Sequence, residues 1–228
     1  MVTVISLGGS IVAPDGVDVE FLKKFRELIR GFIEADGERR FVLVVGGGGP
    51  ARSWQNAYRE IRGGLAENDE ADWIGIMATR LNAQLVKAVM GEWCGQEVVT
   101  NPLESGPFAG RVLVAAGWKP GFSSDNDAVL LAGRFNAKTV INLSNIEKVY
   151  TGDPKKDPDA KPLDRISWAD FRAMTGDEWV PGKNVPFDPV ASREAEKNGL
   201  QVICAAGRNL ENLGKILSGG EFTGTTIS

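Results

Sequence analysis

The hydrophobic positions of the chain fall into two alternating patterns: short continuous runs, and longer segments with apolar residues three or four positions apart. The runs are rich in β-branched residues and end in glycine or polar residues, which is typical of strands buried on both faces. They predict strands at residues 2–7, 41–45, 111–116, 138–143 and 201–205, with further strands at 97–100 and 222–227.

The segments between these runs have the apolar spacing of amphipathic helices. In residues 18–35, for example, Phe21, Phe25 and Ile29 recur on one face. Asp188 followed by Pro189 predicts a helix start, and either Ser124 or Asp125 is a candidate cap for another helix. Helices are predicted at residues 18–35, 50–61, 72–90, from 124 or 125 onward, and at 167–175, 189–198 and 209–217.

Strands that alternate with helices favour βαβ units and a sheet that is parallel at its centre. We therefore predict a single α/β domain over residues 1–228, folded as a three-layer α/β/α sandwich. Its two functional halves are expected to meet near residue 134. Residues 151–162 are rich in Asp, Lys and Pro, which indicates an exposed loop.

Glycine-rich turns follow three of the predicted strands, at residues 8–10, 46–49 and 117–125. Ligands of open α/β sheets bind beyond the carboxyl ends of the strands, so we expect these turns to border one site. Glycines let a ligand approach the backbone, and Arg52 adds a planar positive group suited to phosphate. The alternative is a set of tight turns with a solvent-facing arginine. None of the turns fits the P-loop or the dinucleotide-binding pattern.

Composition narrows the chemistry. The chain has no histidine, so Ser-His-Asp and Cys-His catalysis are excluded and phosphoryl transfer is favoured. The two cysteines are far apart, which argues against a zinc site. A net charge of −4 argues against a nucleic-acid partner, and no uncharged apolar run approaches the ~20 residues of a membrane span. Since the start also lacks a basic leader, we expect a cytoplasmic protein.

Phosphoryl transfer needs cations, and several lie near the predicted turns. Each is also explained as an ordinary surface charge, while the nearby carboxylates could hold magnesium, hold a lysine, cap a helix or stabilise a turn. The candidate cations are Arg52, Arg80, Lys119, Lys148 and Lys183, and the candidate carboxylates are Asp125, Asp127, Glu147 and Asp153.

Four segments together resemble the amino-acid kinase superfamily, and within it the archaeal-type uridylate kinases. They are Gly-Gly-Ser at 8–10, Val-Gly-Gly-Gly at 45–48 with Ala51 and Arg52, Tyr-Thr-Gly-Asp-Pro-Lys-Lys-Asp-Pro at 150–158, and Gly-Thr-Thr-Ile at 224–227. Asp-Trp-Ile-Gly-Ile at 72–76, followed by Thr-Arg at 79–80 and Asn-Ala at 82–83, is similar to the same group.

The resemblance implies a carbamate kinase-like fold with a mainly parallel sheet of about eight strands, assembled as a homohexamer. It implies transfer of the γ-phosphoryl group of ATP to UMP, giving UDP in pyrimidine nucleotide biosynthesis. Mg²⁺ would be carried with ATP, with no separate metal site on the protein. The ATP-binding half would lie at about 134–228, and the half that binds UMP and forms subunit contacts at about 1–133.

The resemblance also assigns residues. On the ATP side they are Gly8, Gly9, Ser10, Gly48, Arg52, Ser144, Tyr150 and Asp153. On the UMP side they are Gly47, Asp72 (facing the ribose hydroxyls) and the turn Trp118, Lys119, Pro120, Gly121, Phe122, Ser123 and Ser124. We assign catalysis to Arg52, Lys183 and Glu147, and name Trp54, Trp73 and Trp93 as candidates for subunit contacts or for the core.

The chain also departs from the family pattern. It has Glu147 and Lys148 where many members have Asp-Gly, lacks a lysine just before Gly8, and carries Trp118 and Lys119 in the third turn. Two alternatives therefore stay open: a kinase of the same fold acting on another phosphate or carboxylate, and a nucleotide-binding or storage protein without turnover.

Overall fold

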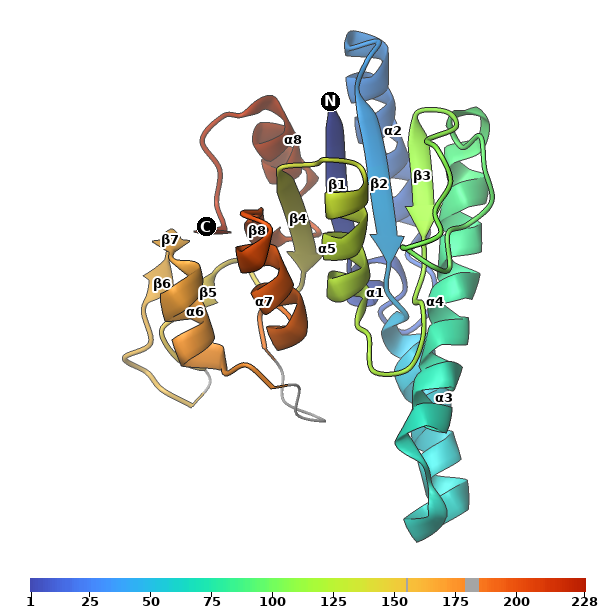
Figure 1. Ribbon diagram of the computed structural model, residues 1–228, viewed down its shortest axis with the longest axis vertical. Helices are drawn as coiled ribbons and strands as arrows, with labels where there is room; N and C mark the ends of the chain where they lie inside the picture. The colour runs from blue at the N-terminus through green and yellow to red at the C-terminus, as the bar shows by residue number, and fades with distance from the viewer. Residues whose placement is uncertain (155, 179–184) are drawn as a thin grey trace.

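The computed structural model describes residues 1–154, 156–178 and 185–228. At its centre is a seven-stranded sheet in the order β3-β2-β1-β4-β8-β9-β7 (Figure 1). All neighbours in this sheet are parallel except β8 and β9. The strands are β1 (Val2–Leu7), β2 (Arg40–Val45), β3 (Val112–Ala115), β4 (Thr139–Ser144), β7 (Arg165–Ile166), β8 (Gln201–Ala206) and β9 (Thr225–Ile227). The predicted α/β sandwich with a mainly parallel sheet is confirmed, with seven strands in this sheet instead of about eight.

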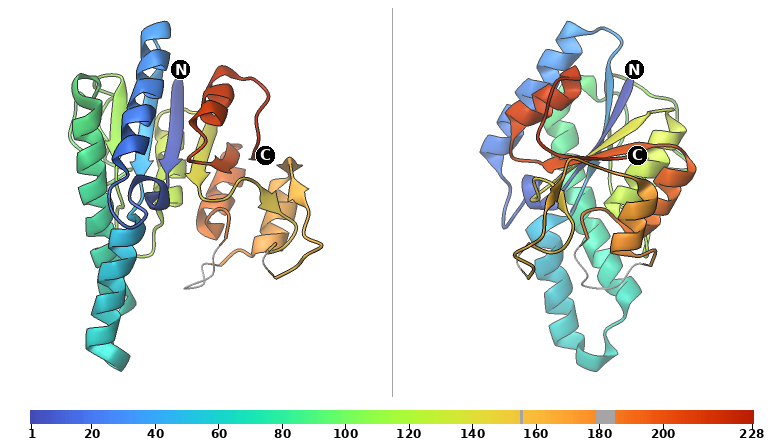
Figure 2. Two further views of the ribbon diagram at one scale, coloured as in Figure 1. Left: turned by 180° about the vertical axis from the view of Figure 1, so that it is seen from behind. Right: turned by 90° about the vertical axis from the view of Figure 1, so that its left-hand side faces the viewer.

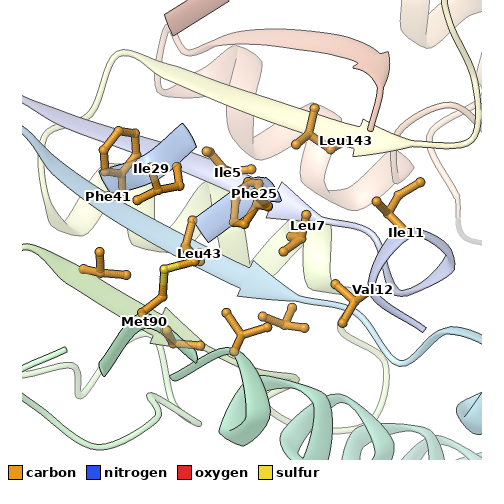
Figure 3. Packing of buried hydrophobic residues seen from close by; sticks show 14 of the residues in the cluster. Ile5, Leu7, Ile11, Val12, Phe25, Ile29, Phe41, Leu43, Met90 and Leu143 are labelled. Carbon is orange, nitrogen blue, oxygen red and sulfur yellow. The ribbon is translucent and has the colours of Figure 1, made fainter. Parts of the chain in front are cut away.

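Helices cover both faces of the sheet, which gives three layers (Figure 2). One face packs against α1 (Gly9–Val12), α2 (Val19–Ala35), α8 (Leu210–Ser218) and the second half of α4 (Asn68–Met90). The other packs against α5 (Ser124–Arg134), α6 (Trp168–Thr175) and α7 (Pro189–Lys197). On the face covered by α1, α2, α4 and α8, buried side chains of the sheet and the helices point toward one another. Figure 3 shows this for Ile5, Phe25, Leu43 and Met90.

Local sequence signals explain most helix positions. The carboxylate of Asp18 accepts the N–H of Phe21 at 3.0 Å and caps α2, whose buried face carries Phe21, Phe25 and Ile29 as predicted. Asp188 caps α7, with Pro189 at its first position. The predicted cap of α5 is wrong: Ser123, one residue earlier, accepts the N–H of Asn126 at 3.2 Å.

Helix α3 (Gly48–Arg62) and the first half of α4 form a hairpin that extends beyond the sheet (Figure 1). A short 3₁₀ turn at Gly63–Leu65 joins them. The hairpin exposes large apolar side chains: Trp54 is 70% exposed, Ile61 83% and Trp73 41%. Trp93, by contrast, packs against the core with the guanidinium of Arg26 4.9 Å from its ring centroid.

Some predicted elements differ. Residues 97–100 form no strand, because only Val99 pairs, with Ala115. The last strand is limited to Thr225–Ile227, and the small sheet of β5 (Val149–Tyr150) with β6 (Pro162–Leu163) was not predicted. Within the part of the chain that the structure describes, no helix combines the length and apolar character of a membrane span.

Candidate active site

The parallel strands β1, β2 and β4 end at one edge of the sheet, and the turns that follow them meet there (Figure 1). Gly8 donates its backbone N–H to the carbonyl oxygen of Leu143 at 2.9 Å. Ser10 donates its hydroxyl to Oδ1 of Asn145 at 2.8 Å. These bonds join the ends of β1 and β4, so the predicted residues Gly8, Ser10 and Ser144 share one region.

The first two glycine turns touch each other through their backbones. A Cβ added to Gly9 would lie 2.0 Å from the nitrogen of Gly48, and one added to Gly46 would lie 2.5 Å from the nitrogen of Gly9. Gly48 also has a φ of +67°, which favours glycine. These glycines are therefore required by the crossing of the two turns, in addition to any ligand that approaches them.

The start of α3 offers fewer donors than the sequence suggested. Gly49 gives its N–H to the carbonyl oxygen of Ala13 at 2.9 Å, and Pro50 has no N–H. Arg52 lies just beyond, exposed to solvent, with Nη2 donating to the carbonyl oxygen of Pro14 at 3.2 Å. An anion at this edge would therefore depend on the guanidinium of Arg52 more than on the helix start itself.

Helix α4 holds the third turn in place. Thr79 accepts the N–H of Gly117 at 2.8 Å through its hydroxyl oxygen. Arg80 donates to the carbonyl oxygen of Trp118 at 3.0 Å. Asp72 accepts the N–H of Gly121 at 3.1 Å, which brings two components of the predicted acceptor site together.

The same helix fixes the second turn. Asn82, which is 4% exposed, donates its side-chain amide to the carbonyl oxygens of Gly46 at 2.9 Å and Gly47 at 3.1 Å. Asn82 and Thr79 were noted only as part of a motif, and neither was predicted to build the site. Since both lie on the face of α4 that meets the turns, the one helix positions two turns relative to each other.

Lys119 is held between aromatic rings on the third turn. Its Nζ lies 4.1 Å from the ring centroid of Trp118 and 4.9 Å from that of Phe122, and the two ring centroids are 4.9 Å apart. The attraction between an ammonium and a ring face restricts the lysine while leaving its charge in place. The turn thus carries a cation whose position is limited by its neighbours.

Two carboxylates on α5 lie behind this turn with raised pKa values. Burial raises the pKa of Asp125 to about 6, against the hydrogen bond that it accepts from Ser6 at 2.9 Å. Burial raises the pKa of Asp127 to about 7, against the N–H of Trp118, which Oδ2 accepts at 3.2 Å. The group from β1 that contacts the carboxylate of Asp125 is thus the neutral hydroxyl of Ser6.

The remaining predicted residues lie around β5. Glu147 is exposed, and Lys148 forms an ion pair with Asp164, which raises the pKa of Lys148. Tyr150 ends β5, and Asp153 lies in the turn that follows, where its carbonyl oxygen accepts the N–H of Asp157 at 2.8 Å. The ion pair holds the cation of Lys148 beside Asp164, which lies between β6 and β7. Lys183 lies outside the described residues.

The sequence also named Asp125, Asp127, Glu147 and Asp153 as candidates to hold magnesium. Among the described residues, no group of three or more acidic, cysteine or histidine side chains comes together in a way that could hold a metal ion. Asp125 instead accepts hydrogen bonds from Ser6 and from the N–H of Asp188 at 3.3 Å. In the described part of the chain, the carboxylate of Asp125 is thus engaged by two protein donors.

The sheet is mainly parallel, two glycine turns cross at its carboxyl edge, and α4 holds the turns by hydrogen bonds. This arrangement is typical of α/β proteins that bind phosphate groups. The sequence model of the amino acid kinase family matches residues 1–206, and the chain belongs to this family. It is 34% identical to a uridylate kinase of Methanospirillum hungatei, covering 99% of this chain and 94% of that protein. It is 31% identical to a uridylate kinase of Methanobrevibacter smithii, covering 100% of both.

Solved structures agree with this membership. The chain matches the crystal structure of uridylate kinase from Archaeoglobus fulgidus with a TM-score of 0.84 and 32% identity, covering 100% of both chains. The UMP kinase of Ureaplasma parvum matches with a TM-score of 0.78 at 16% identity, which shows the fold alone. The resemblance seen in the sequence and the predicted fold class are both confirmed.

Proposed function

We propose that the chain is a uridylate kinase, which transfers the γ-phosphoryl group of Mg-ATP to UMP and gives ADP and UDP. The observation that carries the proposal is full-length similarity to archaeal uridylate kinases, together with glycine turns gathered at one sheet edge. In this reaction a phosphate oxygen of UMP attacks the γ-phosphorus of ATP, and the bond to the leaving ADP oxygen breaks. The chemistry needs positioning and neutralised charge more than a strong base.

We propose that the residues divide between the two substrates as the resemblance implies. The ends of β1 and β4, with Gly8, Ser10 and Ser144, lie toward ATP, and Tyr150 and Asp153 line its nucleoside part. The third turn and Asp72 receive UMP. We keep the proposed ATP-binding half at about 134–228 and the acceptor half at about 1–133, with Gly8 and Ser10 reaching ATP from the acceptor half. The contacts from Asp72 and α4 to the third turn support the acceptor assignment.

Arg52, Lys183 and Glu147 are the proposed catalytic residues. The exposed guanidinium of Arg52 stands beside the crossed glycine turns, where it would neutralise charge that develops on the transferred phosphoryl group. When Mg²⁺ is bound with ATP, it supplies further charge neutralisation between the phosphates. Pre-positioned charge of this kind stabilises the transition state without a proton transfer.

We also propose a homo-oligomer, a hexamer by the family resemblance, with α3 and α4 in a subunit contact. Trp54, Ile61 and Leu65 on the hairpin are each at least 70% exposed. Large apolar side chains gathered on one surface favour a protein–protein contact. Trp54 and Trp73 remain candidates for this contact, whereas Trp93 belongs to the core.

The test is a coupled assay of ADP release with Mg-ATP and a panel of acceptors: UMP, CMP, dUMP, acetylglutamate and none. We expect turnover with UMP well above the other members of the panel. Turnover only with another acceptor would establish a different kinase of the same fold. Binding of ATP or UMP without turnover would support the storage or binding protein instead.

A further inference from the structure

The peptide groups of Trp118 are held from two sides. Asp127 of α5 accepts the N–H of Trp118 at 3.2 Å, while Arg80 of α4 donates to the carbonyl oxygen of Trp118 at 3.0 Å. Arg80 also reaches the carbonyl oxygen of Gly117 at 3.4 Å. Asp127 and Arg80, from two different helices, thus hold Trp118 directly before Lys119. We call this pair of contacts the clamp.

Asp127 is an unusual residue for its surroundings. It is 0% exposed, and among the described residues its Oδ1 has no hydrogen-bond partner. A buried carboxylate with one oxygen lacking a hydrogen bond lowers the free energy of unfolding. An apolar side chain of similar size would avoid that cost. Stability of the core therefore gives no reason for a carboxylate here, whereas the bond to the turn does.

The charges around Asp127 come from three elements. Arg80 of α4 lowers its pKa, and Asp125 on its own helix raises it. Asp188, the cap of α7, adds to the negative charge through its effect on Asp125. The guanidinium of Arg80 is thus the cation that offsets this group of carboxylates, and it makes the other half of the clamp.

We propose that Asp127 is a positioning residue for the acceptor site: with Arg80 it fixes Trp118, so that the third turn holds the ammonium of Lys119 toward the acceptor phosphate. Asp127 acts through Trp118 and does not touch the substrate. This inference rests on the proposed function of the turn. It adds a residue that lies outside the turn and that the resemblance assigned to neither substrate.

The kinetic test compares the wild type with Asp127→Asn, which keeps the shape and the acceptor oxygen but has no charge. Because burial raises the pKa of Asp127 to about 7, the wild-type clamp should weaken between pH 8 and pH 6. We expect KM for UMP to rise about five-fold over this range beyond the change caused by UMP itself, whose phosphate titrates near pH 6. KM for ATP should stay constant.

In Asp127→Asn the titrations of UMP and of Asp125 should remain while that of Asp127 is lost, and KM for UMP should be about five-fold above wild type at pH 8. Asp18→Asn is the matched control, because Asp18 caps α2 away from the turn and Asn preserves a cap. The inference is overturned if Asp127→Asn keeps the wild-type pH profile, or if KM for ATP and for UMP rise together.

A second measurement needs no substrate. Hydrogen exchange of the amide of Trp118 should be faster in Asp127→Ala than in the wild type, with unchanged exchange in α2. Equal exchange of this amide in the two proteins overturns the clamp. A wild type that fails to use UMP while the amide of Trp118 loses protection in the variant refutes the proposed function and leaves the clamp supported.

Discussion

Replacing Asp127 by Asn should change how the stability of the protein depends on pH. Burial raises the pKa of Asp127 from its ordinary value of 3.8 to about 7, so the folded state binds this proton more tightly than the unfolded state. The contribution is fully present below the unfolded pKa and is lost as pH rises through the folded pKa. Over that window the loss is about 1.4 kcal/mol per pH unit.

The expected change in the free energy of unfolding follows from the two pH units between pH 5 and the folded pKa of about 7. From pH 8 to pH 5, the wild type should gain about 3 kcal/mol of unfolding free energy from Asp127, and the Asn variant should gain none. The stability of Asp127→Asn relative to wild type should therefore fall by about 3 kcal/mol from pH 8 to pH 5. The absolute difference at one pH is less informative, because the buried amide has donors that cost about 1–3 kcal/mol if unpaired.

Urea unfolding followed by tryptophan fluorescence at pH 5, 6, 7 and 8 measures this change. Asp125 titrates in both proteins, so its own contribution cancels apart from its coupling to Asp127. Asp18→Asn is the control: the N–H of Phe21 and the guanidinium of Arg208 lower the pKa of Asp18, so its difference from wild type should be flat over this range. A flat difference for Asp127→Asn as well would refute the argument that burial raises the pKa of this carboxylate.

Three further predictions concern single positions. Arg52→Ala should lower kcat with UMP by about 100-fold through lost stabilisation of the transferred phosphoryl group, and an unchanged kcat would make Arg52 a surface residue. Asp72→Asn should raise KM for UMP about five-fold and leave KM for ATP unchanged, because the carboxylate of Asp72 accepts its hydrogen bond from the third turn. Equal effects on both constants would contradict the assignment. Gly9→Ala should destabilise the fold by about 3 kcal/mol in thermal unfolding, because a Cβ at this position would lie 2.0 Å from the nitrogen of Gly48.

Elements with strong local signals were predictable from the sequence. The strands at the centre are continuous apolar runs. Helices α2 and α7 begin directly after Asp18 and Asp188, whose carboxylates accept a backbone N–H three residues later. The small strands β5, β6 and β7 were missed because each has only two residues, and their pairing depends on partners far along the chain. Short pairings of this kind leave no periodic signal for sequence analysis to detect.

The cap of α5 shows how distant contacts decide between neighbouring candidates. Three adjacent residues, Ser123, Ser124 and Asp125, all have suitable side chains. Asp125 accepts the hydroxyl of Ser6, which lies 119 positions earlier in the chain, so its carboxylate is committed to β1. Ser123 then serves as the cap. No local pattern contains that choice.

The site divides in the same way. The three glycine turns and Asp72 were found because glycine and the family motif mark them in the sequence. Asn82 and Thr79 were not recognised as builders of the site, since a polar residue on an amphipathic helix is ordinarily a solvent-facing one. Only the packing of α4 against the turns reveals that these two side chains bind turn backbone.

The two effects assigned to Asp127 have opposite signs, and this distinguishes them from a general loss of structure. Acidification from pH 8 to pH 6 protonates the buried carboxylate, which stabilises the fold but weakens the charge-assisted bond to the N–H of Trp118. Stability should therefore rise while affinity for the acceptor falls. If protonation simply loosened the protein, stability and affinity would decline together. The ionised carboxylate of Asp127 costs stability, yet it is the ionised form that binds the N–H of Trp118 more strongly. Asp127 therefore has a role in the site and not in the core.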